Sequence, residues 1–391
     1  MDKKFPIDNK SLQKIPYGRQ LIDDEDIAAV CSVLRSDWIT TGPKVSEFEQ
    51  AVADYVGAKY AIAVSSGTAA LHCAMYAINI ECEDEVITSP MTFAATANSV
   101  VYQGGTPVFA DINSDTLLID PDKIEEKISN RTKALVSVDY AGQPCDYDRL
   151  KDITDRYGLF LIGDSCHSLG AKYKGQKVGK LADLTIFSFH PVKHICTGEG
   201  GMIVTDNHIF ADRMRAFRNH GILSEHHKRD SWYYEMTDLG FNYRLTDFQC
   251  AMGISQIKKL PDWLKCRQEI AMKYDEAFKT FPPISLLKKY VYNYHAYHLY
   301  VVIFKNSYIR SDIFNYLKNQ GIGVNVHYIP VYLHPFYKVK LGTFEGLCPL
   351  AEDLYKRILS LPIFPGMNDS DVNRVICSIK NYFNNRKLTI K

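Results

Sequence analysis

The sequence lacks the features that would mark a membrane or nucleic-acid-binding protein. Its 391 residues contain no run of about 18 consecutive apolar residues, so no transmembrane helix is expected. The first ten residues, MDKKFPIDNK, are not followed by the apolar run of a signal peptide, which predicts a cytoplasmic protein. The 46 Lys and Arg residues balance 45 Asp and Glu residues. A net charge of +1 provides no overall field that would attract nucleic acid or an acidic membrane.

Common cofactor and metal motifs are missing as well. No G-x-G-x-x-G follows a predicted strand, and GQKVGKL around Gly175 lacks the spacing of a Walker loop, so dinucleotide and ATP sites lose their usual support. The ten cysteines include no C-x-x-C pair and are interpreted as reduced thiols, mostly buried. The adjacent histidines His226 and His227 lie in the charged stretch EHHKRD, which is typical of a solvated loop. We therefore expect no metal site.

What is present is the pattern of an α/β protein. With 46% hydrophobic and 23% charged residues, the composition is that of a globular chain with a large core. Apolar residues at three- and four-residue steps predict helices over 25–35, 45–56, 68–78 and 94–103. Short β-rich runs such as EVITS, ALVSV, LFLIGD and LTIFSF alternate with the helical stretches. This alternation predicts a mostly parallel sheet covered on both faces.

The pattern changes in the last third of the chain. Residues 248–279 are helical, with a break expected at Pro261. A strand over 297–304, a helix over 311–319, a strand in GVNVHYIP and two late helices follow. We predict a large domain over 1–265 and a small C-terminal α+β domain over 266–391.

Three elements at the ends of predicted strands can carry chemistry, because open α/β sheets bind ligands there. SSGTAAL turns from a strand into a helix whose amides can hold a phosphate, or its Ser and Thr can simply cap the helix. Asp164 ends an apolar strand and needs a cationic partner, either a protonated pyridine or a structural Arg or Lys. Lys193, in SFHPVK, is a nucleophile only if its pKa is lowered, and otherwise a surface charge.

In this order, the three elements and their neighbours resemble the DegT/StrS sugar aminotransferases. The matching segments are SSGTAAL, PMTFAATAN, DSCHSLGA, SFHPVK, TGEGGM and GFNYRLTDFQCAMGISQ, which are spread over most of the chain. DSCHSLGA departs from the family in carrying Cys166 and Ser168 where alanines are common. The resemblance implies pyridoxal 5'-phosphate (PLP) as the cofactor. It also implies the aspartate-aminotransferase fold, type I, with a mostly parallel seven-stranded sheet in the large domain.

The resemblance also assigns roles to individual residues. Lys193 corresponds to the catalytic lysine that binds the cofactor covalently and then shuttles a proton, and Asp164 to the partner of the pyridine nitrogen. The other expected cofactor contacts are Gly67, Thr68, Phe93, His167, Ser188 and, from the partner subunit of a homodimer, Asn242. The nucleotide sugar is expected to contact Tyr17, Asp37, Trp38, Ile39, Thr40, His327, Tyr328, Ile329 and Pro330.

Within the family, the segments IPYGRQLIDDEDI, SDWITTGPKVSEFE, VDYAGQ and VHYIPVY look most like the pseudaminic acid branch. That likeness implies transfer of an amino group from L-glutamate to C4 of a UDP-linked 4-keto-6-deoxy-N-acetylhexosamine. Two alternatives stay open. The substrate can be another 4-keto sugar, of the bacillosamine type or linked to dTDP, or the protein can be a non-catalytic regulator of the same family, although the presence of Lys193 and Asp164 argues against the latter.

Overall fold

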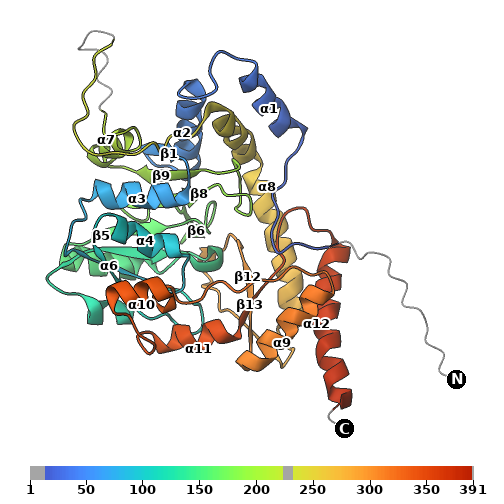
Figure 1. Cartoon of the computed structure of the whole chain (residues 1–391). Coiled ribbons are helices and arrows are strands. Elements are labelled where there is room, and N and C mark those ends of the chain that lie inside the picture. The colour runs from blue at the N-terminus through green and yellow to red at the C-terminus, as the bar shows by residue number, and fades with distance from the viewer. Residues whose placement is uncertain (1–13, 223–231, 390–391) are drawn as a thin grey trace.

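The computed structural model describes residues 14–222 and 232–389, so the histidine pair at 226 and 227 lies outside the described residues. Its centre is a seven-stranded sheet in the order β1-β9-β8-β5-β4-β2-β3 (Figure 1). β9 is antiparallel to both of its neighbours, and the remaining pairs are parallel, which confirms the predicted sheet. The strands are β1 (Tyr60–Val64), β2 (Glu85–Thr88), β3 (Thr106–Phe109), β4 (Thr132–Val138), β5 (Phe160–Asp164), β8 (Leu184–Ser188) and β9 (Gly201–Thr205).

Helices cover both faces of this sheet, as buried parallel strands require. In β1, Ile62 and Val64 pack in a core cluster with α3 and α7, whereas Ala61 and Ala63 pack in another with α2 and α8. The helices of this part are α1 (Asp24–Leu34), α2 (Pro43–Val56), α3 (Gly67–Ala77), α4 (Ala94–Tyr102), α5 (Pro121–Ile124), α6 (Tyr147–Tyr157) and α7 (His208–Phe217), with the short turns η1 (Glu125–Lys127) and η2 (Tyr140–Gly142). The four predicted helices are therefore present within two residues of their expected ends.

The expected break at Pro261 is wrong, because α8 (Asp247–Phe278) continues through it. A proline inside a helix costs about 3 kcal/mol. Here the ring is exposed, so water can bond to the carbonyl that it leaves free, while Leu260 and Leu264 are buried on either side. Packing of these side chains offsets the cost. The helix connects the large sheet to the C-terminal part of the molecule, as Figure 1 shows. The predicted domain boundary at 265 falls within α8 and stays a prediction.

The C-terminal part contains the sheet β10-β12-β13, formed by Ile284–Leu286, Tyr300–Phe304 and Ile358–Leu361. The strand expected in GVNVHYIP is wrong. This segment makes only one isolated bridge, between Asn325 and Ser360, and its polar residues Asn325 and His327 line a cavity instead. The remaining elements are α9 (Ser307–Asn319), η3 (Val331–Leu333), α10 (Pro335–Leu341), α11 (Pro349–Arg357), α12 (Asp369–Thr389) and the small sheet β11 (Asn293–Tyr294), β6 (Lys172–Tyr173), β7 (Gln176–Lys177). No helix among residues 14–222 and 232–389 could span a membrane.

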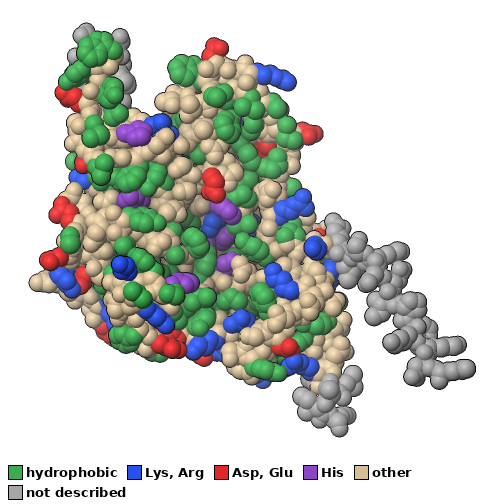
Figure 2. Space-filling model, in the orientation of Figure 1, with side chains coloured by type: hydrophobic (Ala, Val, Ile, Leu, Met, Phe, Trp, Pro, Cys, Tyr) green, Lys and Arg blue, Asp and Glu red, His purple; other side chains and the backbone are tan. Residues whose placement is uncertain are grey.

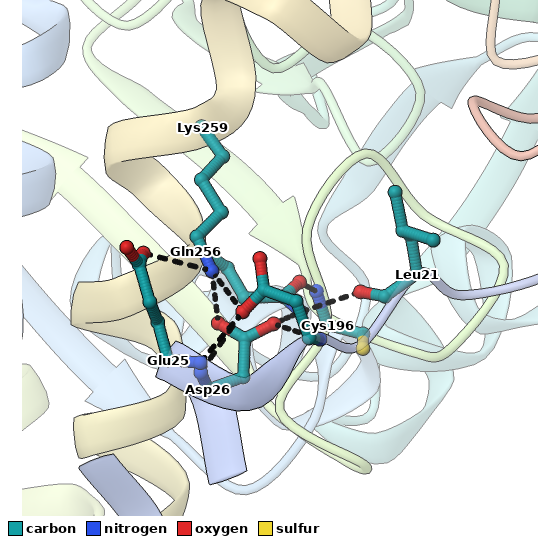
Figure 3. A network of polar contacts seen from close by, with 7 residues as sticks. Leu21, Glu25, Asp26, Cys196, Gln256 and Lys259 are labelled. Atoms are coloured by element: carbon teal, nitrogen blue, oxygen red, sulfur yellow. Dashed lines mark hydrogen bonds and ion pairs between the residues drawn. The ribbon is translucent and has the colours of Figure 1, made fainter. Parts of the chain in front are cut away.

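A network of hydrogen bonds and ion pairs connects α1 to α8 (Figure 3). Asp26 is only 1% exposed, and its carboxylate accepts hydrogen bonds from Gln256 Nε2 at 2.9 Å and Lys259 Nζ at 3.0 Å. Gln256 also donates to the Leu21 carbonyl and accepts from the Cys196 amide at 3.0 Å. One glutamine thus connects the N-terminal segment, α8 and the loop that follows β8.

This network predicts unequal effects for two neighbouring acidic residues. Asp26→Ala removes a buried acceptor and leaves the Gln256 amide unpaired on one side, so we expect a loss of about 2 kcal/mol of unfolding free energy. Glu25→Ala is the matched control, because the Glu25 side chain is 81% exposed and contacts Lys259 only at 3.4 Å. Urea unfolding measures both variants. Equal losses would contradict the assignment of the network to Asp26.

Candidate active site

A cavity of about 600 Å³ lies at the carboxyl ends of the parallel strands. Its wall combines the turn after β1, the residues that follow β2, β5 and β8, and the segment 325–328 from the C-terminal part. Figure 2 shows histidine side chains gathered in a hollow near the middle of one face. This is the position at which ligands bind in open α/β sheets.

The first wall of the cavity is the N-terminus of α3. Ser66 caps this helix by accepting a hydrogen bond from the Ala69 amide at 3.0 Å. A Cβ at Gly67 would come within 2.9 Å of the Ser188 Cβ, and one at Gly201 within 2.3 Å of the Ser66 carbonyl oxygen. Both glycines are needed for this close approach. It places the free amides of the first helical turn beside the Ser188 hydroxyl, an arrangement suited to a phosphate.

A buried carboxylate lies at the end of β5. Asp164 is 6% exposed and accepts a hydrogen bond from Thr96 Oγ1 at 2.6 Å and from the Cys166 amide at 3.3 Å. Within the described part of the chain, no Lys, Arg or His nitrogen lies within ion-pairing distance of it. The carboxylate therefore keeps acceptor capacity for a cationic group in the cavity.

Lys193 enters the cavity from the loop between β8 and β9. The loop is closed by a bond from the Phe189 amide to the Gly200 carbonyl at 2.8 Å, and Lys193 N–H donates to the His190 carbonyl at 2.8 Å. Its side chain is partly exposed toward the cavity. Burial lowers the pKa of Lys193, and the nearby Cys166 and Asp164 oppose this shift. The amine is therefore more nucleophilic at neutral pH than a surface lysine.

Three imidazoles surround the lysine. His167 Nε2 lies 3.0 Å from the Tyr328 hydroxyl, and His298 Nε2 lies 3.5 Å from Lys193 Nζ. His327 is held through Ser360 Oγ at 2.9 Å. Burial is the largest cause that lowers the pKa of each, with Lys193 as a further cause, and for His327 the pKa falls to about 4. At neutral pH these rings are uncharged.

A second buried carboxylate holds the turn that follows β5. Asp139 is fully buried, and its oxygens accept hydrogen bonds from Ser165 Oγ at 2.9 Å, Ser168 Oγ at 2.6 Å and Tyr147 Oη at 3.1 Å. The two serines stand on either side of His167 in sequence. Asp139 therefore orients the turn from behind, without entering the cavity itself.

The structure brings together most of the residues predicted to bind a cofactor. These cavity-lining residues are Gly67, Thr68, Phe93, Asp164, His167, Ser188 and Lys193. Phe93 is 63% exposed, so its ring is available to stack on a planar ligand. Of the predicted substrate contacts, Tyr17, His327 and Tyr328 also line the cavity.

The remaining predicted contacts do not line the cavity of their own chain. Residues 37–40, Ile329 and Asn242 are exposed, and Pro330 is buried elsewhere. Asp37, Trp38, Ile39 and Thr40 are joined to the segment after Asn242, since Thr40 bridges Thr246 and the Ile39 carbonyl accepts from the Asp247 amide at 3.0 Å. These residues therefore stay predictions.

Sequence reasoning missed several polar residues of the cavity, among them Thr96 and His298. Thr96 lies in PMTFAATAN, where only Phe93 was singled out, and its position three residues further along α4 brings it to the same wall. His298 precedes the apolar strand β12, and nothing in its own segment signals that it faces Lys193 across the molecule. No group of three or more His, Cys, Asp or Glu suited to a metal occurs in the ranges 14–222 and 232–389.

The comparison with protein families decides the assignment. The model of the DegT/DnrJ/EryC1/StrS aminotransferase family matches residues 20–380. The chain belongs to this family. It is 43% identical over 377 residues to the spore coat polysaccharide biosynthesis protein SpsC of Bacillus subtilis, covering 94% of this chain and 96% of the relative.

Two further relatives carry more specific names. The UDP-4-amino-4,6-dideoxy-N-acetyl-β-L-altrosamine transaminase of Campylobacter jejuni is 42% identical over 366 residues, covering 92% of this chain and 95% of the relative. The solved structure of Helicobacter pylori PseC, an aminotransferase of pseudaminic acid biosynthesis, superposes with a TM-score of 0.90 at 35% identity, covering 95% of this chain and all of the other.

Membership of the family makes the chain a PLP-dependent sugar aminotransferase. The expected fold class, cofactor and enzyme class are confirmed. Solved family members include one in its PLP form, at 31% identity and a TM-score of 0.89 over 94% of this chain and 98% of the other.

The buried Asp139 predicts a specific pH dependence of stability. Burial raises the pKa of Asp139 from 3.8 to about 6, so the folded chain binds this proton more tightly than the unfolded chain. Stability from this group is therefore lost as the pH rises from about 4 to 6, by up to about 3 kcal/mol. Asp139→Asn cannot titrate and is the reference. We expect urea midpoints of wild type to fall relative to the variant over this range, and parallel pH curves would contradict the assignment.

Proposed function

We propose that this enzyme transfers the amino group of L-glutamate to C4 of a UDP-4-keto-6-deoxy-N-acetylhexosamine. The product is UDP-4-amino-4,6-dideoxy-N-acetyl-β-L-altrosamine, an intermediate for pseudaminic acid and hence for a surface glycan or a glycosylated flagellin. The observation that carries the proposal is that Lys193 and Asp164 line one cavity, in a chain similar over nearly its whole length to a transaminase of that name. We place the reaction in the cytoplasm.

The cavity residues fit PLP. Asp164 has acceptor capacity and no ion-pair partner among the described residues, which suits a protonated pyridine nitrogen. A Cβ at Gly67 would close the space between α3 and Ser188, where the helix amides and the hydroxyl suit the phosphate. Phe93 offers an exposed ring for stacking, and His167 lies on the cavity wall. PLP, when bound, supplies an electrophilic carbon for amines and a ring that withdraws electrons.

The chain's own residues then have distinct tasks. Lys193 supplies the amine that holds the cofactor, and the same Nζ is free to carry a proton to and from the carbon next to the transferred nitrogen. Burial lowers the pKa of Lys193, so the amine releases this proton more readily than a surface lysine does. Asp164 keeps the ring nitrogen protonated. Tyr17, His327 and Tyr328 line the same cavity and are the residues that we expect to contact the sugar.

Analysis of the product would show which nucleotide sugar is the substrate. Purified protein would be incubated with L-glutamate and, in parallel, the proposed UDP sugar, its epimer of the bacillosamine route and a dTDP-4-keto sugar. NMR of the product would give the configuration at C4. Preferential turnover of the first sugar supports the proposal, and preference for either other sugar replaces it. Transfer to one of these other sugars is the second candidate function, because SpsC is as similar to this chain as the altrosamine transaminase is.

The role of Lys193 predicts the behaviour of one variant. Lys193→Ala should lose both the absorbance of covalently bound cofactor and all measurable turnover, because no other amine replaces Nζ. The fold should persist, since Nζ has only one hydrogen-bond contact in the described structure, at 3.5 Å. Borohydride reduction followed by peptide mapping locates the cofactor. Its attachment to a different lysine in wild type would show that the assignment is wrong.

We further propose a homodimer in which Asn242 and residues 37–40 complete the partner's cavity. Asn242 is exposed, and its side chain has no hydrogen bond to any described residue. Large apolar side chains are exposed in residues 232–241, which precede Asn242, and in the segment 37–40, as expected of residues that contact a partner. They are Trp38, Ile39, Trp232, Tyr234, Met236, Leu239 and Phe241.

A shared site predicts complementation between two defective chains. Lys193→Ala and Asn242→Ala should each be inactive or severely impaired, but a hybrid dimer contains one site with neither substitution. With random re-association, about a quarter of the wild-type activity should return. Activity is measured after subunit exchange is demonstrated with differently tagged chains. No recovery in exchanged dimers would contradict the shared site.

A further inference from the structure

The amine of Lys193 has one hydrogen-bond partner among the described residues, His298. The Nε2 atom of His298 lies 3.5 Å from Lys193 Nζ. The Nδ1 atom of His298 is buried and has no hydrogen-bond partner in the described structure. The ring is 5% exposed. Leaving one nitrogen of a buried imidazole without a hydrogen bond costs free energy. We therefore expect the contact between the other nitrogen and the amine to have a function.

The backbone of His298 is held from two sides. Arg267 on α8 donates from Nη1 to the carbonyls of Tyr297, at 3.0 Å, and of His298, at 3.5 Å. The next residue, Leu299, donates its amide to the Ala141 carbonyl at 3.1 Å. The imidazole is therefore fixed by the C-terminal part of the molecule, while the lysine comes from the β8–β9 loop.

Among the described residues, the titratable groups that shift the pKa of this ring are a lysine, an arginine and two imidazoles. His167 packs against it with ring centroids 4.2 Å apart, His194 lies at 5.7 Å, and Lys193 and Arg267 complete the surroundings. Burial, followed by Lys193 and the other three groups, lowers the pKa of His298 well below its usual range. The ring is neutral at working pH, and a neutral imidazole can accept a hydrogen bond.

We propose that His298 is a positioning residue whose Nε2 accepts a hydrogen bond from the Lys193 ammonium and holds it over the cavity when the lysine carries no cofactor. The inference rests on the proposed role of Lys193. It requires the tautomer of His298 that carries its hydrogen on Nδ1, because only then is Nε2 an acceptor. Through this hydrogen bond, a residue of the C-terminal part directly contacts the amine that moves the proton.

The proposed hydrogen bond should change the pKa of Lys193, which can be measured. Asp164 and Cys166 raise the pKa of Lys193, and an acceptor at Nε2 adds to them by stabilising the ammonium. In His298→Phe the ammonium loses that acceptor in a buried place, so its apparent pKa should fall by about one unit. His298→Gln keeps an acceptor oxygen and should restore part of the difference.

The test uses the full chain freed of cofactor and pulsed with acetic anhydride between pH 6 and 11. Mass spectrometry of the peptide containing Lys193 gives its acetylation rate, and the pH dependence gives its apparent pKa. His295→Gln is the matched control, because His295 is a half-buried histidine three residues away that does not line the cavity. A thermal melt of each variant confirms folding. In the holoenzyme, His298→Phe should lower kcat several-fold with little change in the KM for L-glutamate.

Two results would overturn the inference: an unchanged Lys193 pKa in folded His298→Phe, or an equal shift in His295→Gln. If His298→Phe does not fold, His298→Gln decides by the same comparison with wild type. Failure of the proposed function appears separately, as borohydride fixing the cofactor to another lysine in wild type. The two failures are therefore distinguishable.

Discussion

The pairing of β5 with β8 is the constraint on which the active site depends. Asp164 is paired with Ile186, so Ser188 stands two residues further along the neighbouring parallel strand, and the Lys193 loop begins directly after it. Parallel neighbours lie about 4.8 Å apart and end at the same edge of the sheet. A buried carboxylate and a half-buried amine therefore reach the same cavity without long loops. Asp164 has hydrogen bonds from Thr96 and the Cys166 amide but no ion-pair partner among the described residues, so its charge is compensated only in part.

Desolvation then determines the chemistry of the neighbours. The same burial that lowers the pKa of Lys193 also lowers those of His167, His298 and His327, so the wall beside the amine is uncharged but able to hydrogen-bond. A neutral imidazole can accept a hydrogen bond from an ammonium group or donate one to a neutral amine. The cavity can thus serve both protonation states of the lysine without gaining a second positive charge.

Much of this arrangement could be predicted from the sequence. SSGTAAL, DSCHSLGA and SFHPVK each follow an apolar strand, and periodicity located the strands and helices of the sheet well. The errors have physical causes. The predicted break at Pro261 is absent, because buried leucines on both sides of it outweigh the lost hydrogen bond. His298 could not be identified because its partner is 105 residues away in the chain, and no local pattern encodes such a contact.

The support behind the lysine also comes from distant parts of the sequence. Gln256 accepts from the Cys196 amide, three residues after Lys193, and the same side chain contacts Asp26 and the Leu21 carbonyl. The N-terminal segment that continues to Tyr17, on the cavity wall, is thus held to the lysine loop by one amide group. Because a rotation of the Gln256 side chain would release both partners together, the loop and the substrate side of the cavity are expected to become ordered as one unit.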